Sequence, residues 1–149
     1  MKKLFFLLLS VIYLNCVNAQ NMSNKKLDKM LIGIADSIER DFGKWQFYYK
    51  GVKMVLLTDE FYNRMRIISP IIYVKDLKPD YFKKSLEANF HSSLDCKYAI
   101  SDEIMWTVFI HPLKELSEAQ FKDALDQLNS SAKTFGTTYS SGNLHFQKK

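Results

Sequence analysis

Metal binding and acid–base catalysis are the first chemistries to test against this sequence, through its histidines and its paired carboxylates. His91, His111 and His145 stand far apart, without the short spacing that ligands of one metal site usually show. The acidic pairs Asp59-Glu60 and Asp102-Glu103 fall in segments predicted as turns, where water solvates them. General acid–base catalysis instead needs a desolvated or coupled carboxylate. The sequence therefore predicts neither a metal site nor an acid–base pair.

Nucleophilic and phosphate chemistry also lack a motif. Ser140-Ser141-Gly142 does not have the spacing of a nucleophile elbow, and the 5 glycines form no phosphate-binding loop. Cys96 lies in an alternating apolar segment, which favours a buried, inert thiol over a nucleophile. We therefore predict a non-enzymatic protein without a cofactor. The alternative is a small-ligand-binding or enzymatic domain whose residues converge on a dispersed pocket.

Four side chains form the candidate binding surface. Tyr48 and Tyr73 lie on strand faces that the pattern does not assign, and exposed aromatic rings would offer a stacking platform for a sugar or a base. Arg64 and Arg66 share one strand face and would meet an acidic partner. Core packing of the aromatic rings and structural ion pairs of the arginines are the alternatives.

The N-terminus has the pattern of an export signal. Lys2 and Lys3 form a basic start, residues 4–14 form a short apolar core, and Val17-Asn18-Ala19 resembles a signal-peptidase site. The apolar run is too short for a stable membrane span. We therefore expect residues 1–19 to be a signal peptide, Gln20 to begin the mature chain, and the protein to be periplasmic or secreted.

Cleavage after residue 19 would remove Cys16 and would change the net charge, so that Cys96 would be the one cysteine left. A lipoprotein would begin at Cys16, but Leu14-Asn15 lacks the small residue that normally precedes a lipidated cysteine, so lipidation is not expected. Loss of two lysines leaves 19 basic against 16 acidic residues, a net charge of +3. These charges are spread evenly along the chain, which argues against nucleic-acid binding.

Alternation of apolar and polar residues predicts five strands, over residues 45–50, 52–57, 64–74, 96–100 and 104–110. Pro70 cannot donate a ladder hydrogen bond, so we expect an edge, a bulge or a break there. The last strand is apolar on both faces, which predicts a central strand covered on both sides. The tail is expected either to add a strand through residues 144–146 or to fray.

Helical spacing predicts three helices. The first ends near Gly43 and carries four apolar positions in register: Leu27, Leu31, Ile34 and Ile38. The second opens near Pro79, and its inward positions are expected to be Phe82, Leu86 and Phe90.

The third helix has the most complete signals. Ser117 and Gln120 predict a capping box, and Gly136 is placed for a left-handed C-terminal cap. The apolar stripe of this helix contains Phe121, Leu125 and Leu128, which we expect to pack on Trp106 and Val108.

The order of elements is α-β-β-β-α-β-β-α, with short connections that favour hairpins. We therefore predict one α+β domain over residues 20–149, with a mainly antiparallel five-stranded sheet flanked by helices. This order resembles the YbjN and type III secretion chaperone-like family with its CesT-like fold. The segments that carry the resemblance are 64–70, 86–90, 97–100, 106, 109–113, 135–136 and 139–142.

The resemblance implies a compact domain, often dimeric, that binds proteins and has no cofactor or catalytic residues. On this basis we expect an exported protein-binding or chaperone-like module with an unknown protein partner. The strand over residues 64–74 is apolar on both faces and needs cover at its second half. A helix of the same chain or a second copy in a homodimer would provide that cover.

Overall fold

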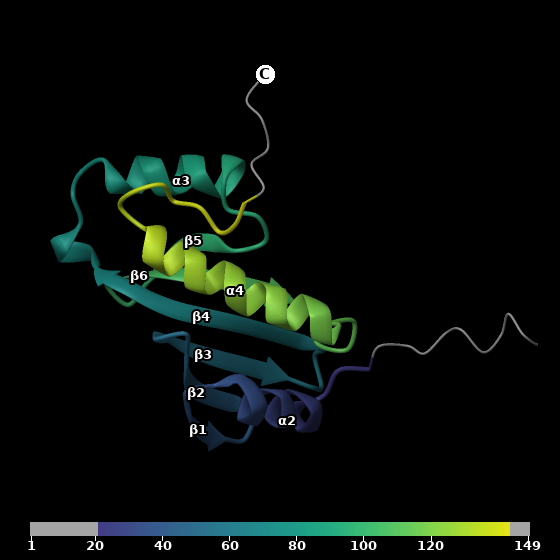
Figure 1. Ribbon diagram of the computed structural model, residues 1–149. Coiled ribbons are helices and arrows are strands. Elements are labelled where there is room, and N and C mark those ends of the chain that lie inside the picture. Colours follow the sequence, from purple (N-terminus) through teal and green to yellow (C-terminus); the bar gives the residue numbers. More distant parts are fainter. Residues whose placement is uncertain (1–20, 144–149) are drawn as a thin grey trace, which may run out of the picture.

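The computed structural model describes residues 21–143 and contains three α-helices and six strands in that part of the chain (Figure 1). In chain order the elements are α2 (Asn24–Ile34), β1 (Ser37–Asp41), β2 (Lys44–Tyr49), β3 (Val52–Asp59), β4 (Arg64–Tyr73), the 3-10 turn η2 (Val74–Asp76), α3 (Tyr81–His91), β5 (Lys97–Ser101), β6 (Ile104–His111) and α4 (Glu118–Thr134). The predicted signal peptide and the predicted tail strand lie outside the described residues.

The strands form one sheet in the order β1-β2-β3-β4-β6-β5, and each neighbouring pair is antiparallel. The predicted α+β class and antiparallel sheet are confirmed. The predicted number of five strands is wrong, because the sheet has six.

The additional strand is β1, in a segment where the sequence predicted a continuing helix. Helix α2 ends at Ile34, and the next residue is already extended. The backbone N–H of Asp36 donates to the carbonyl of Tyr48 (2.8 Å), and Ile38 pairs with Phe47. Ile38 therefore continues the helical spacing of the apolar residues only by coincidence, while pairing with β2 fixes its true conformation.

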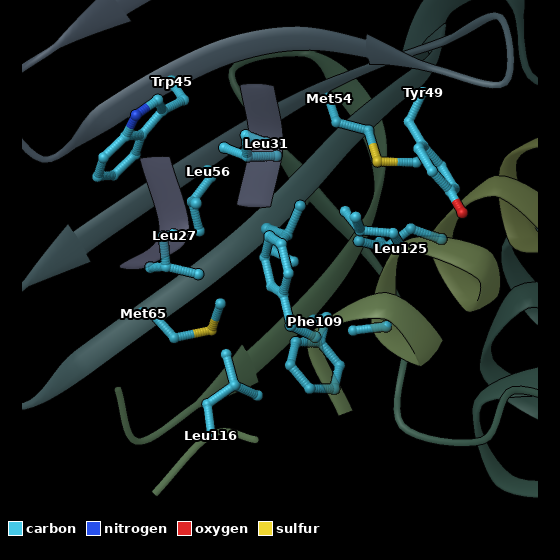
Figure 2. Packing of buried hydrophobic residues seen from close by; sticks show 14 of the residues in the cluster. Leu27, Leu31, Trp45, Tyr49, Met54, Leu56, Met65, Phe109, Leu116 and Leu125 are labelled. Carbon is cyan, nitrogen blue, oxygen red and sulfur yellow. The ribbon is translucent and has the colours of Figure 1, made fainter. Parts of the chain in front are cut away.

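Helices α2 and α4 pack on one face of the sheet, here called the core face, and α3 lies along the β5 edge. The main core joins α2, α4 and the inward side chains of β2, β3, β4 and β6 (Figure 2). Fully buried members include Leu27 and Leu31 of α2, Phe47 of β2 and Phe121 of α4. Burial of this much apolar surface is the main stabilising contribution to the domain.

Helix α4 agrees with its prediction. The hydroxyl of Ser117 accepts from the backbone N–H of Gln120, whose side-chain oxygen accepts from the backbone N–H of Ser117, so the capping box is complete. Phe121, Leu125 and Leu128 are fully buried. Gly136 has φ +81°, the left-handed conformation that glycine adopts without strain.

Helix α3 is rotated relative to its prediction. Phe82, Leu86 and Phe90 were expected to face inward but are 39%, 69% and 79% exposed, whereas Ser85 and Ala88 are buried. The side-chain amide of Asn89 accepts from the N–H of Tyr98 (2.7 Å) and donates to its carbonyl (3.1 Å). These two bonds hold α3 with its Ser85 and Ala88 side against β5.

The prediction for Pro70 is confirmed as a β-bulge, because the register of β4 with β6 shifts between Pro70 and Ile72. Pairing of β4 with β3 ends at Ile68, so the missing N–H of Pro70 interrupts no bond to β3. Beyond the bulge, Ile71 and Ile72 pack against a second small core that includes Ala88 of α3. On the core face, this half of β4 thus packs against a cluster to which a helix of the same chain contributes, while Tyr73 on its other face is 57% exposed.

Candidate functional site

The opposite face of the sheet, here called the open face, carries no helix in the described part of the chain. In strands β3, β4 and β6, alternate side chains point away from the buried core. Seven apolar side chains among them make up what we call the apolar strip: Val55, Leu57, Ile68, Pro70, Trp106, Val108 and Ile110. The strip crosses three adjacent interior strands of the sheet.

Strand register makes the strip continuous. Ile68 of β4 lies opposite Val55 on one side and Val108 on the other. Pro70 lies opposite Trp106, whose indole N–H donates to the carbonyl of Ser101 (3.0 Å). Directly opposed side chains on one face touch, so the strip is one surface and not a set of scattered residues. Most of its members are half-buried by each other, and Ile110 is 64% exposed.

These positions correct one prediction. Trp106 and Val108 were expected beneath α4, but they lie on the open face, and Met105, Thr107 and Phe109 occupy the core face of β6. The strand is central but covered by helices on one side only. Because β6 is apolar in both phases of its alternation, the sequence pattern does not reveal which phase meets the helices.

The charged residues that β3, β4 and β6 place on the open face are mostly basic. Lys53, Arg64 and Arg66 are cations, and Asp59 is the single anion. The carboxylate of Asp59 accepts from the backbone N–H of Tyr62 (2.8 Å), so this anion is engaged in the β3–β4 turn. Four ion pairs occur within residues 21–143, and none involves Lys53, Arg64 or Arg66.

Arg66 lies at one end of the apolar strip. It lies opposite Leu57 of β3 and opposite Ile110 of β6. A shallow hollow of about 270 Å³ opens at this point and is lined by Leu57, Thr58, Asp59, Arg64, Met65, Arg66 and Ile110. Arg64 donates through Nη1 to the carbonyl of Asn63 (3.0 Å). The hollow therefore combines two guanidinium groups and the carboxylate of Asp59 with an apolar floor.

The four side chains predicted as a binding surface all lie on the open face, in three separate places. Arg64 and Arg66 are neighbours at the hollow. Tyr48, 45% exposed, lies on β2 opposite Lys53. Tyr73, 57% exposed, lies at the other end of β4 from Arg64, opposite Ile104. The arrangement brings the arginines together but does not build one aromatic platform.

Sequence reasoning missed the apolar strip itself. The available signal was the presence of apolar residues in both phases of β3, β4 and β6, most clearly at Val108 and Ile110. For β6 that pattern predicted cover on both sides, and for β4 it left cover by a helix of the same chain or by a second copy.

Cys96 is completely buried, and this burial raises the pKa of its thiol to about 12. A thiol so rarely ionised is a poor nucleophile, which agrees with its predicted inert character. Within residues 21–143, no group of three or more histidine, cysteine, aspartate or glutamate side chains is arranged to hold a metal ion. His111 donates through Nδ1 to the carbonyl of Pro112 (2.8 Å), and His145 lies outside the described residues.

Three of the four paired carboxylates, Glu60, Asp102 and Glu103, occupy turns as predicted, whereas Asp59 is the last residue of β3. Glu60 accepts from the backbone N–H of Asn24 (2.9 Å), which attaches the β3–β4 turn to the start of α2. Asp102 and Glu103 have φ values of +51° and +58° in the β5–β6 turn. These residues shape backbone turns, and no second carboxylate is bonded to them.

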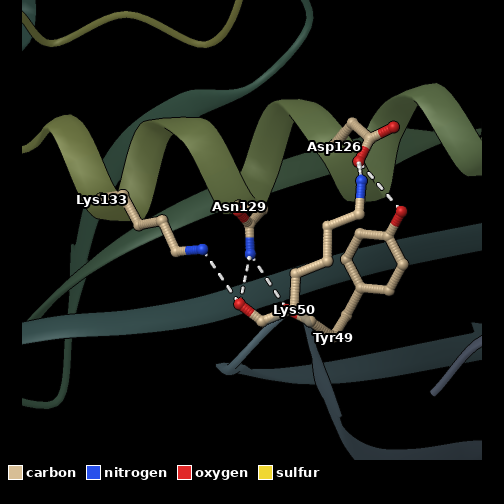
Figure 3. A network of polar contacts seen from close by, with 5 residues as sticks. All are labelled: Tyr49, Lys50, Asp126, Asn129 and Lys133. Atoms are coloured by element: carbon tan, nitrogen blue, oxygen red, sulfur yellow. Dashed lines mark hydrogen bonds and ion pairs between the residues drawn. The ribbon is translucent and has the colours of Figure 1, made fainter. Parts of the chain in front are cut away.

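A separate polar network joins the β2–β3 hairpin to α4 (Figure 3). The hydroxyl of Tyr49 and the ammonium of Lys50 both donate to Asp126, and Asn129 donates to the carbonyl of Tyr49 (3.0 Å). Burial raises the pKa of Tyr49, and the hydrogen bond from Lys50 to Asp126 raises the pKa of Lys50. These bonds run between the hairpin and α4, so the network holds the hairpin on the helix.

Comparison with known proteins gives no family assignment: no family model and no curated protein matches the chain. Among the helices in residues 21–143, none combines the length and the apolar character that crossing a membrane requires.

Proposed function

We propose that this protein is a non-enzymatic protein-binding module of chaperone-like type, which holds its partner on the open face. One observation carries the proposal: seven contiguous apolar side chains cross three adjacent interior strands on the side without helices. Apolar patches of this extent on soluble domains commonly mark interaction sites.

The shape of the open face favours a macromolecule over a small ligand. Small-ligand pockets usually enclose most of the ligand within about 300–1,000 Å³. The hollow beside Arg66 is shallow, with about 270 Å³ of space. The buried Cys96 and the turn carboxylates add no reactive group at the strip. Resemblance to the YbjN and secretion chaperone-like family and the predicted export signal complete the proposal of an exported binding module.

Site-specific photocrosslinking in the producing cell tests this proposal. A photoreactive phenylalanine analogue replaces Ile110 on the open face, and a matched variant carries it at Lys122, an exposed position of α4 on the other side of the domain. We expect protein adducts from position 110 and few from position 122. Equal labelling from both positions would contradict a specific binding face.

Purified partner then provides the quantitative test. Ile110→Asp places a charge in the apolar strip, and we expect at least about tenfold weaker binding, as for a central interface residue. Lys122→Glu is the surface control and should bind as the wild type does. Unchanged affinity in the folded Ile110→Asp variant would show that the strip is not the binding surface.

A further inference from the structure

The hollow at Arg66 indicates the kind of partner that fits the open face. We infer that the open face binds an amphipathic helix of a partner protein, whose apolar stripe is flanked by carboxylates that pair with Arg66 and Arg64. This inference rests on the proposed function, and it adds the secondary structure and the charge of the bound segment.

The helical form follows from the backbone of the sheet. In β4, the residues under the centre of the strip are paired with β3 on one side and β6 on the other. An extended segment laid across this face would find no backbone partner and would bury unpaired N–H and C=O groups. A helix satisfies its own backbone and presents an apolar stripe, which is how helices already cover the core face.

The acidic character follows from the unpaired cations. Arg66 stands between Leu57 and Ile110, so a helix packed on the strip passes over its guanidinium group. Neither Arg66 nor Arg64 takes part in an ion pair within the described residues. A carboxylate beside the apolar stripe would form charge-assisted, bidentate hydrogen bonds with arginine, whereas a lysine there would be repelled. The same cations disfavour a second copy of the chain in this position.

The length of the bound helix follows from the length of the open face along β4. Arg64 and Pro70 are six residues apart on β4, and a strand rises about 3.3 Å per residue, so the face spans roughly 20 Å. A helix covers that length in about 13 residues. A synthetic peptide of about 18 residues is therefore long enough to test the site.

Two labelled peptides of that length provide the test. Both have leucine at helical spacing, and they differ only in the flanking residues, which are glutamate in one and lysine in the other. Binding to the unlabelled protein is measured by fluorescence anisotropy at low salt. We expect the glutamate peptide to bind about tenfold more tightly, the effect of one or two charge-assisted bonds at a partly solvated site. Raising the salt concentration should reduce this preference.

A charge reversal identifies the residue responsible. Arg66→Glu should reverse the preference, so that the lysine peptide binds better. Lys122→Glu makes the same charge change on α4 and should leave the preference unchanged. Circular dichroism melting confirms that each variant is folded.

The remaining outcomes separate the inference from the proposed function. Equal binding of both peptides, abolished by Ile110→Asp, would overturn the inference while leaving the binding face in place. No binding of either peptide, together with no adducts from position 110, would overturn both. A dimer mass in light scattering that Ile110→Asp returns to the monomer would assign the face to a second copy. Displacement of the peptide by phosphatidylglycerol vesicles would assign the open face to a membrane surface. Either the dimer result or the vesicle result would overturn the inference.

Discussion

Truncation of Phe121 to alanine tests the packing of α4 on the sheet. The ring is fully buried in the main core, and a phenylalanine side chain buries about 150–250 Å². At about 25 cal/mol per Å² this corresponds to roughly 4–6 kcal/mol, from which alanine's better helix preference subtracts about 0.5 kcal/mol. We expect the free energy of unfolding to fall by about 3–5 kcal/mol, in agreement with other phenylalanine truncations.

Urea denaturation followed by circular dichroism measures this loss, and Leu86→Ala is the matched control. Leu86 is 69% exposed on α3, so its truncation should change the free energy of unfolding by less than about 0.5 kcal/mol. Phe121→Leu provides a milder variant if Phe121→Ala does not fold. A loss below about 1 kcal/mol for Phe121→Ala, or an equal loss for Leu86→Ala, would refute the packing described here.

Further predictions concern the buried titrating groups, the helix cap and the export signal. Because the pKa of Cys96 is raised to about 12, native protein at pH 8 should react with a thiol reagent at least about a hundredfold more slowly than urea-denatured protein. Burial also raises the pKa of Tyr98 to about 12. The contribution of Tyr98 to stability is therefore complete below about pH 10 and is lost as the pH rises towards 12. Urea titrations across that range should show a smaller decline in the free energy of unfolding for Tyr98→Phe than for the wild type. Ser117→Ala removes the capping box and should cost about 1 kcal/mol in the same assay, whereas Ser117→Asp should cost less. N-terminal sequencing of the exported protein should begin at or close to Gln20, and an unprocessed Met1 would contradict the signal peptide.

Sequence predicted the elements whose signals are local. The capping box and stripe of α4 lie within one segment, and Pro70 excludes regular pairing by its own chemistry. Residue spacing did not predict β1, because Ile38 fits a helix as well as a strand until β2 pairs with it. Local sequence pattern predicts the secondary structure of such a segment correctly only when its tertiary contacts favour the same structure.

The orientation of α3 and the position of the open face could not be predicted from local sequence pattern, because both depend on contacts with segments that are distant in sequence. Phe82, Leu86 and Phe90 form an apolar stripe at helical spacing, yet the bonds of Asn89 with Tyr98 turn a different side of α3 to the sheet. For the candidate site, the shared face of Arg64 and Arg66 followed from alternation alone. Their position beside Ile110 followed only from strand order, since β6 is distant in sequence.

The two edges of the sheet have a consequence for self-templated aggregation. A row of unpaired backbone groups at an edge recruits further strands, and charged side chains are one defence against this. Strand β1 carries Glu39, Arg40 and Asp41, all exposed, so another strand could add there only beside three charges. At the opposite edge, the amide of Asn89 occupies the N–H and carbonyl of Tyr98. A domain with an uncovered apolar surface can thus meet partners through that surface while its edges resist growth into fibrils.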